Sequence, residues 1–160
     1  MVFYIITFIC IGKQKNIGDS MPRLKLKPLN NYSFSTDITV RTTDLNYGGH
    51  LGNDKLLSLV HEARVAFLAG HGFSERNCAG VSLIVGDIAI VYHSEAFVKD
   101  VLRFDVAAGE LTRCGFRLFY RITRTSDNRL IALVENGVVC FDYKTHTTQP
   151  LPEAVEAVLR

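Results

Sequence analysis

The sequence predicts an α+β domain that combines an antiparallel sheet of about five strands with one long helix. Residues 55–70 place apolar side chains at three- and four-residue steps, which is typical of a helix with one buried face. Asn53 or Asp54 is suited to cap its start. Most of the remaining chain consists of alternating or continuously apolar runs separated by turn residues, as in strands. Several antiparallel strands with one helix on a face make an α+β domain.

The first expected strand covers residues 33–43, where apolar and polar side chains alternate. Phe34, Ile38 and Val40 have the parity of the apolar side, and Asp44 shares this parity. If the strand continues that far, the Asp44 carboxylate points toward the core. A carboxylate in that position needs binding partners or a function.

The remaining strands are expected in the second half of the chain. Residues 81–92 are apolar on both parities, which predicts a central strand covered on both faces, with a bulge at Gly86–Asp87. Turns are expected at Gly109–Glu110 and at residues 126–128, and a kink at Asn136–Gly137. The other strands are expected to follow as a meander at residues 101–108, 111–124 and 130–143. A short helix at residues 150–160 is expected to end the chain.

The composition is that of a single globular domain. Of the 160 residues, 48% are apolar and 21% are charged, which is enough to bury a core and gives no sign of disorder. A formal charge of +2 without a run of basic residues argues against nucleic-acid binding. The cysteines are widely spaced with no CxxC pair, which predicts reduced thiols in a cytoplasmic protein: Cys10, Cys78, Cys114 and Cys140.

The first twenty residues differ from the rest of the chain. Residues 2–12 are apolar but fall short of the roughly 20 residues that span a bilayer. No basic residue precedes this run and no A-x-A-like site follows it, so a signal peptide is not indicated. Because Met21 leads directly into the first strand, we hypothesise that residues 1–20 are an extension outside the fold. The domain would then be residues 21–160, and the alternative is that the extension is a weak membrane anchor.

A polar, glycine-rich segment lies immediately before the long helix, at residues 44–54. The free N–H groups and the positive end of a helix dipole point into a loop at this position. Backbone N–H groups between Gly48 and Gly52 are therefore suited to polarise a carbonyl or to stabilise an oxyanion.

This segment resembles the hotdog-fold thioesterases, in particular their 4-hydroxybenzoyl-CoA thioesterase-like and acyl-carrier-protein thioesterase branches. In that family a strand ends in D-x-x-G-H-V-N-N or D-x-D-x-N-x-H-V-N-N, and the following helix carries E-A-R. Here residues 44–53 (DLNYGGHLGN) match the longer pattern in spacing, and residues 62–64 are EAR. The resemblance covers roughly residues 34–143. It implies a hotdog fold, in which the sheet wraps around the one long central helix.

The resemblance also implies an activity, hydrolysis of acyl-CoA or acyl-carrier-protein thioesters with water as co-substrate and no cofactor. The family carboxylate falls on Asn46, and an amide cannot act as a base or nucleophile. Either Asp44 takes that role, or Asn46 orients a water that another group activates, or the site binds thioesters without cleaving them. His50 is expected to orient the acyl group or to act as an acid or base.

Catalytic roles are thus expected for three residues: Asp44, Asn46 and His50. Substrate contacts are expected from five more: Gly48, Gly49, Asn53, Glu62 and Arg64. The histidines show no metal-ligand spacing, so no metal is expected. A dehydratase or isomerase is a further alternative, with His50 and Glu62 as an acid–base pair. Because hotdog proteins pair their sheets across a two-fold axis and hold their sites between subunits, the resemblance implies a homodimer or homotetramer.

Overall fold

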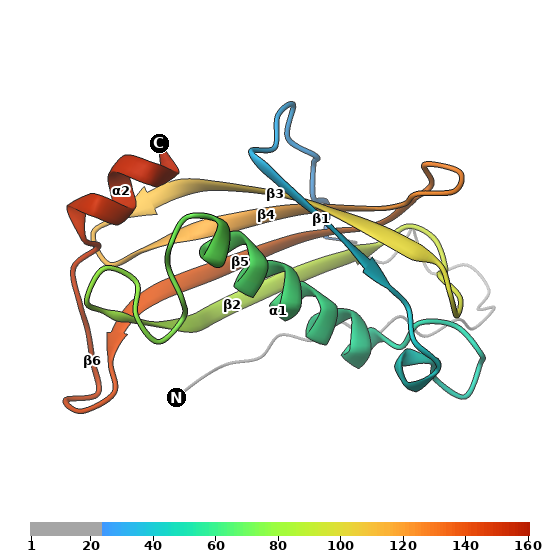
Figure 1. The fold of residues 1–160 in the computed structure, drawn as a ribbon, viewed down its shortest axis with the longest axis horizontal. Helices are drawn as coiled ribbons and strands as arrows, with labels where there is room; N and C mark the ends of the chain where they lie inside the picture. The colour runs from blue at the N-terminus through green and yellow to red at the C-terminus, as the bar shows by residue number, and fades with distance from the viewer. Residues whose placement is uncertain (1–23) are drawn as a thin grey trace, which may run out of the picture.

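The computed structural model describes residues 24–160, so the predicted extension at residues 1–20 lies outside the described part of the chain. Its elements, in chain order, are β1 (Phe34–Thr39), the short 3-10 helix η1 (Thr42–Asp44), α1 (Asn53–Gly70), β2 (Ser82–Tyr92), β3 (Val101–Thr112), β4 (Gly115–Arg124), β5 (Leu130–Asp142), β6 (Thr147–Thr148) and α2 (Glu153–Leu159). The strands form one antiparallel sheet, and α1 lies across one of its faces (Figure 1). The predicted α+β class is confirmed.

The core lies between α1 and the sheet. The predicted apolar face of the helix is confirmed, because its members are all at most 2% exposed: Leu56, Leu59, Val60, Ala63, Phe67 and Leu68. Facing them are buried side chains of the sheet such as Phe104, Leu118 and Ile122. Each large side chain buried in this way contributes about 1.5–3 kcal/mol. Burial of this face therefore holds α1 on the sheet.

The order of strands in the sheet, β1-β3-β4-β5-β2, differs from the predicted meander. Only β3, β4 and β5 follow one another as neighbours, whereas β2 pairs with β5. Within the described residues β2 is therefore an edge strand, and the prediction of a central strand was wrong. Apolar periodicity reports which faces of a strand are covered, but it contains no information about the neighbouring strand. As a result, the connection at residues 93–100 has to cross the end of the sheet.

Other differences concern where elements begin and end. The first strand stops at Thr39, and Asp44 lies in the 3-10 helix that follows. The expected turn at Gly109–Glu110 is an irregularity in the register of β3, and the chain turns instead at residues 113–114. The bulge at Gly86–Asp87 is confirmed by a register shift opposite β5. The short strand β6 was not predicted.

α1 begins at Asn53 with Gly52 as its N-cap, and no side chain caps it. The predicted cap by Asn53 or Asp54 was therefore wrong. Asn53 instead accepts a hydrogen bond from the N–H of Asp54 through its side-chain oxygen.

Three of the four cysteines lie in the described residues, and Cys78, Cys114 and Cys140 are free thiols as expected. Within residues 24–160, none of the helices combines the length and apolar character needed to cross a membrane. The cytoplasmic location stays a prediction.

Candidate functional site

A pocket of about 630 Å³ lies at the N-terminal end of α1. Its walls come from the loop and first turns of α1 (Asn46 to Leu56), from the end of β2 and the connection after it (Tyr92 to Ala96), and from Ile131 of β5. Leu51, Leu56 and Ile131 provide apolar wall, and the polar lining comes both from the loop before α1 and from the connection after β2. A pocket of this size that combines apolar walls with a few polar groups is typical of small-molecule sites.

Two backbone hydrogen bonds close the loop that carries the polar groups. The N–H of Asn46 donates to the carbonyl of His50 (2.9 Å), and the N–H of Gly49 donates to the carbonyl of Asn46 (3.0 Å). Gly49 has φ +78°, a left-handed conformation that side chains disfavour, so glycine is the suitable residue there. The tight turn brings the side chains of Asn46 and His50 together, and both line the pocket.

The side chains of Asn46 and His50 form a hydrogen-bonded pair whose orientation is determined by the backbone. The N–H of Gly48 donates to Oδ1 of Asn46 (2.8 Å), so this atom must be the amide oxygen. The amide nitrogen then faces Nδ1 of His50 at 3.3 Å. Because an NH₂ group is a donor only, Nδ1 has to accept, and neutral His50 carries its proton on Nε2.

Gly48 also makes room for this pair. A side-chain carbon at residue 48 would lie 3.0 Å from Nε2 of His50 and 3.2 Å from Oδ1 of Asn46. Both contacts are tighter than ordinary packing, so even alanine would displace the imidazole or the amide.

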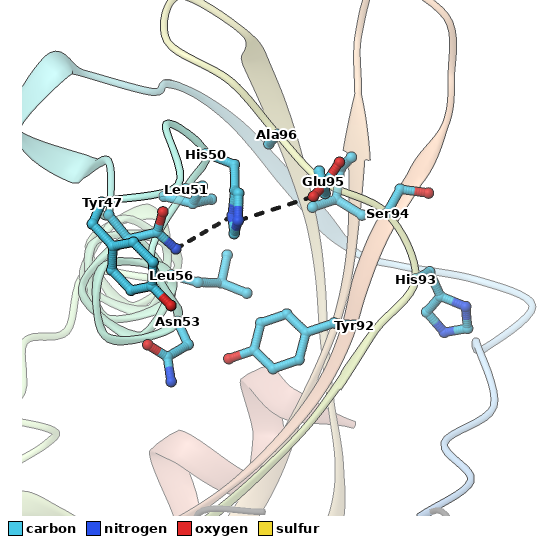
Figure 2. A pocket seen from close by; sticks show the side chains of 12 residues that line it. Tyr47, His50, Leu51, Asn53, Leu56, Tyr92, His93, Ser94, Glu95 and Ala96 are labelled. Atoms are coloured by element: carbon cyan, nitrogen blue, oxygen red, sulfur yellow. Dashed lines mark hydrogen bonds and ion pairs between the residues drawn. The ribbon is translucent and has the colours of Figure 1, made fainter. Parts of the chain in front are cut away.

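Glu95 lies on the opposite side of the imidazole, with its Oε1 atom 3.9 Å from Nε2 of His50 (Figure 2). Backbone contacts on both sides hold it there. The N–H of Ser94 donates to the carbonyl of Ile131, and the carbonyl of Ala96 accepts from the N–H of Leu51 (2.8 Å). Sequence reasoning missed Glu95, because nothing in the motif indicates that the connection after β2 folds against the loop before α1.

Tyr92 and Asn53 complete the polar part of the pocket. Figure 2 shows the Tyr92 hydroxyl pointing toward the side of the pocket that carries Asn53. Burial, helped by the negative charge of Asp54, raises the pKa of Tyr92 and keeps its hydroxyl protonated as a donor. His93 is adjacent in sequence, but its ring points away from the centre of the pocket (Figure 2).

Asp44 is not among the residues that line the pocket. It is only 2% exposed, as expected, although it lies in η1 and not in the strand, and it binds Arg41 through the backbone N–H (2.8 Å) and two guanidinium nitrogens (3.1 Å each). These hydrogen bonds lower the pKa of the Asp44 carboxyl although burial opposes them. The carboxylate thus has partners that account for its burial, and the expected placement in the catalytic site needs correction.

Four of the expected backbone donors of the glycine-rich loop are already occupied. Besides the N–H groups of Gly48 and Gly49, which bind Asn46, that of Leu51 donates to Ala96 and that of Gly52 to the carbonyl of Asp44 (2.9 Å). The expectation that this backbone stabilises an oxyanion is therefore wrong for these four groups. The donors that remain in the pocket include the Tyr92 hydroxyl, the His50 Nε2–H and the first-turn N–H of α1 at Asn53, which has no intrahelical acceptor.

Neither Glu62 nor Arg64 lines the pocket, so the structure does not bring them to the expected substrate site. Glu62 is exposed on α1. Arg64 is 7% exposed and donates to Oε1 of Glu75 and to Oδ1 of Asn136 (2.8 Å), which ties α1 to the following loop and to β5. The EAR motif thus contributes Arg64 to the interior, and we correct its assignment from substrate binding to fold stabilisation.

Comparison with known proteins agrees with this architecture. The sequence profile of the thioesterase-like superfamily matches residues 40–159. The chain belongs to the thioesterase-like superfamily. Membership confirms the resemblance and agrees with the predicted activity, thioester hydrolysis. No match was found among curated protein sequences.

Solved structures of two named thioesterases and of one hypothetical protein share the fold. Slr0204, a 1,4-dihydroxy-2-naphthoyl-CoA thioesterase from Synechocystis, is similar at 20% identity and a TM-score of 0.72, over 79% of this chain and 94% of its own. The DHNA-CoA thioesterase of Staphylococcus aureus is similar at 18% identity and a TM-score of 0.71, over 78% of this chain and 89% of its own. The hypothetical protein SAV2348 of S. aureus, solved in complex with CoA, is similar at 20% identity and a TM-score of 0.70, over 78% of this chain and 79% of its own. At these identities the likeness establishes the hotdog fold.

Proposed function

We propose that the protein is an acyl-CoA thioesterase, which hydrolyses the thioester to a carboxylic acid and free CoA. The observation that carries this proposal is the Asn46–His50 pair, which presents an imidazole N–H to a partly apolar pocket at the N-terminus of α1. Hydrolysis of a thioester requires a donor for the developing oxyanion, because the carbonyl oxygen becomes negative as water attacks.

The proposed roles follow from the hydrogen bonds around the pocket. Asn46 positions the imidazole, and the Nε2–H of His50 donates to the thioester carbonyl, assisted by the positive end of the α1 dipole near Asn53. The apolar wall that includes Leu56 takes the acyl group. Asp44 acts at a distance, since its carboxylate holds Arg41 and its carbonyl anchors the N-cap of α1.

Coenzyme A is the proposed carrier of the acyl group. The support comes from the similar structures, of which two are named as CoA thioesterases and a third was solved with CoA. An acyl-carrier protein remains the alternative carrier, and comparison of the two thioesters of one acyl chain distinguishes them.

We further propose that the protein is a homo-oligomer, as the resemblance implies, and that β2 takes part in the contact. Within residues 24–160, β2 pairs with β5 alone and leaves its other edge unpaired. Its apolar residues on both faces, including Ile84, Val85 and Val91, are only half-buried. A long apolar edge strand is prone to pair with another chain. Light scattering is expected to give a dimer or tetramer of the 17.9 kDa chain, and a monomer would contradict the proposal.

The activity is tested by following free-thiol release from a panel of aliphatic and aromatic acyl-CoAs with the full chain. We expect turnover of at least one substrate and a loss of roughly tenfold or more in kcat for His50→Ala, which removes the donor. Binding of acyl-CoA without thiol release from any substrate would instead identify a binding module. Hydration of an enoyl-CoA would identify a dehydratase.

A further inference from the structure

We propose that Glu95 is the general base of the hydrolysis, in place of the carboxylate that the sequence lacks at residue 46. This inference rests on the proposed thioesterase function. It starts from a requirement of the reaction: a water molecule has to lose a proton as it attacks the thioester carbon, and a nearby side chain must accept that proton.

His50 cannot accept this proton at the atom that faces the pocket. The Gly48 N–H fixes the orientation of the Asn46 amide, and the amide in turn makes Nδ1 of His50 the acceptor. The neutral imidazole therefore presents a proton, and no lone pair, at Nε2. Asn46 itself is an amide without basicity, so the pair supplies a donor only.

Among residues 24–160, Glu95 is the one carboxylate that lines this pocket. Asp44, a carboxylate of the motif, is committed to Arg41 and buried away from the pocket. The Glu95 side chain is 66% exposed, and no donor within residues 24–160 forms a hydrogen bond to it. Its carboxylate thus has free lone pairs for a water molecule.

The distance between Glu95 and His50 suits a division of labour. At 3.9 Å, Oε1 of Glu95 and Nε2 of His50 are too far apart for a direct hydrogen bond, so the carboxylate can still accept from a water and the imidazole N–H can still donate to a substrate. They are also close enough that a water on Oε1 and a carbonyl oxygen on Nε2 would lie side by side. Reacting atoms need to approach to about 3–3.5 Å, which this arrangement favours.

The fold holds Glu95 in this position from both sides. Ser94 is anchored to β5, and Ala96 is 2% exposed and hydrogen-bonded to Leu51, the residue next to His50. The backbone contact between Ala96 and Leu51 therefore couples the connection that carries the base to the loop that carries the donor.

The proposed step balances as follows. The Glu95 carboxylate takes a proton from water while the water oxygen forms a bond to the thioester carbon. The carbonyl π electrons move to the oxygen, which accepts a hydrogen bond from the Nε2–H of His50. A lone pair of the oxyanion then re-forms the C=O bond as the C–S bond breaks, and the C–S electron pair stays on sulfur, which receives the proton from Glu95. The products are one carboxylic acid and one thiol, and the Glu95 carboxylate is restored.

The experiment compares Glu95→Gln and Glu95→Ala with the wild type and with Glu153→Gln. Glu153 is an exposed residue on α2, which lies at the end of the sheet away from the N-terminus of α1 (Figure 1). We expect Glu95→Gln to lower kcat by roughly a hundredfold or more, the usual contribution of a general base, with KM changed by less than about threefold. Formate should restore activity to Glu95→Ala by supplying the missing carboxylate, and Glu153→Gln should behave as wild type.

A second measurement does not depend on turnover. Nitrogen-15 NMR of the wild-type protein, at a pH where the His50 imidazole is neutral, should show the Nε2–H tautomer. An Nδ1–H tautomer would overturn the inference, because His50 could then act as the base. A kcat for Glu95→Gln within about threefold of an active wild type would overturn it too, while the thioesterase function would stand. Absence of thiol release by the wild type from every acyl-CoA would refute the proposed function and this inference together.

Discussion

Replacement of Arg64 by methionine distinguishes a structural role for this arginine from substrate binding. Methionine keeps an unbranched apolar stem but removes the guanidinium donors to Glu75 and Asn136. Asn136 is fully buried, so loss of its donor is expected to cost about 1–3 kcal/mol. Glu75 is partly exposed and keeps His61 as a partner (3.0 Å), so its share is at most about 1 kcal/mol.

The sum, about 1–4 kcal/mol, corresponds to a fall in Tm of about 2–16 °C for a domain of this size. The fall is measured by thermal unfolding followed by circular dichroism, together with urea unfolding. Arg103→Met is the matched control, since Arg103 pairs with Asp37 on the surface (side chains 51% and 43% exposed) and its loss should cost less than about 1 kcal/mol.

The same variants determine whether the buried network acts as a unit. If Arg64 and Glu75 stabilise the fold through each other, Arg64→Met and Glu75→Gln should be less than additive in the double mutant. An Arg64→Met protein that unfolds within about 1 °C of the wild type but has a raised KM for acyl-CoA would refute the reasoning. Arg64 would then contact substrate, as the resemblance implied.

Three further substitutions test the loop before α1. The hydrogen bonds from Arg41 lower the pKa of Asp44 below its unfolded value, against the opposing effect of burial, so the ionised carboxylate stabilises the fold at neutral pH. Asp44→Asn should lower Tm at pH 7 and leave kcat within about fivefold of the wild-type value. The difference in Tm between the variant and the wild type should shrink below about pH 4, where the carboxyl of the unfolded chain binds a proton. A difference that stays the same at lower pH would contradict this prediction. Asn46→Asp should move the proton of neutral His50 from Nε2 to Nδ1, because a carboxylate can only accept a hydrogen bond. Nitrogen-15 NMR measures the tautomer, and an unchanged Nε2–H form would contradict this prediction. Gly48→Ala should lower kcat by about tenfold through displacement of the imidazole, with Tm lowered by only a few degrees; full activity would show that the ring has room to move.

Local features of the site could be predicted because they depend on neighbouring residues. The apolar face of α1 follows from the three- and four-residue spacing of side chains such as Leu56 and Phe67, and it is buried as expected. Asn46 and His50 were expected in the same loop, and the hydrogen bond between them, which was not predicted, forms across a short turn within it. The roles of these two residues in catalysis stay predictions.

The placement of Asp44 and Arg64 shows where prediction from spacing was insufficient. Both belong to the motif, yet each finds its partners outside the pocket, Asp44 in Arg41 and Arg64 in Glu75 and Asn136. The expectation that Asp44 is buried was correct, but it was based on a strand that ends at Thr39, and it could not distinguish a paired buried carboxylate from a catalytic one.

The sequence by itself determined the α+β class, the helix with its buried face, and the polar loop before the helix that contains Asn46 and His50, because hydrophobic periodicity and loop composition are encoded within a few consecutive residues. Only the tertiary structure decided that β2 lies beside β5 and that the following connection carries Glu95 to His50. These contacts join residues far apart in the chain, and their positions depend on how the whole sheet packs against α1.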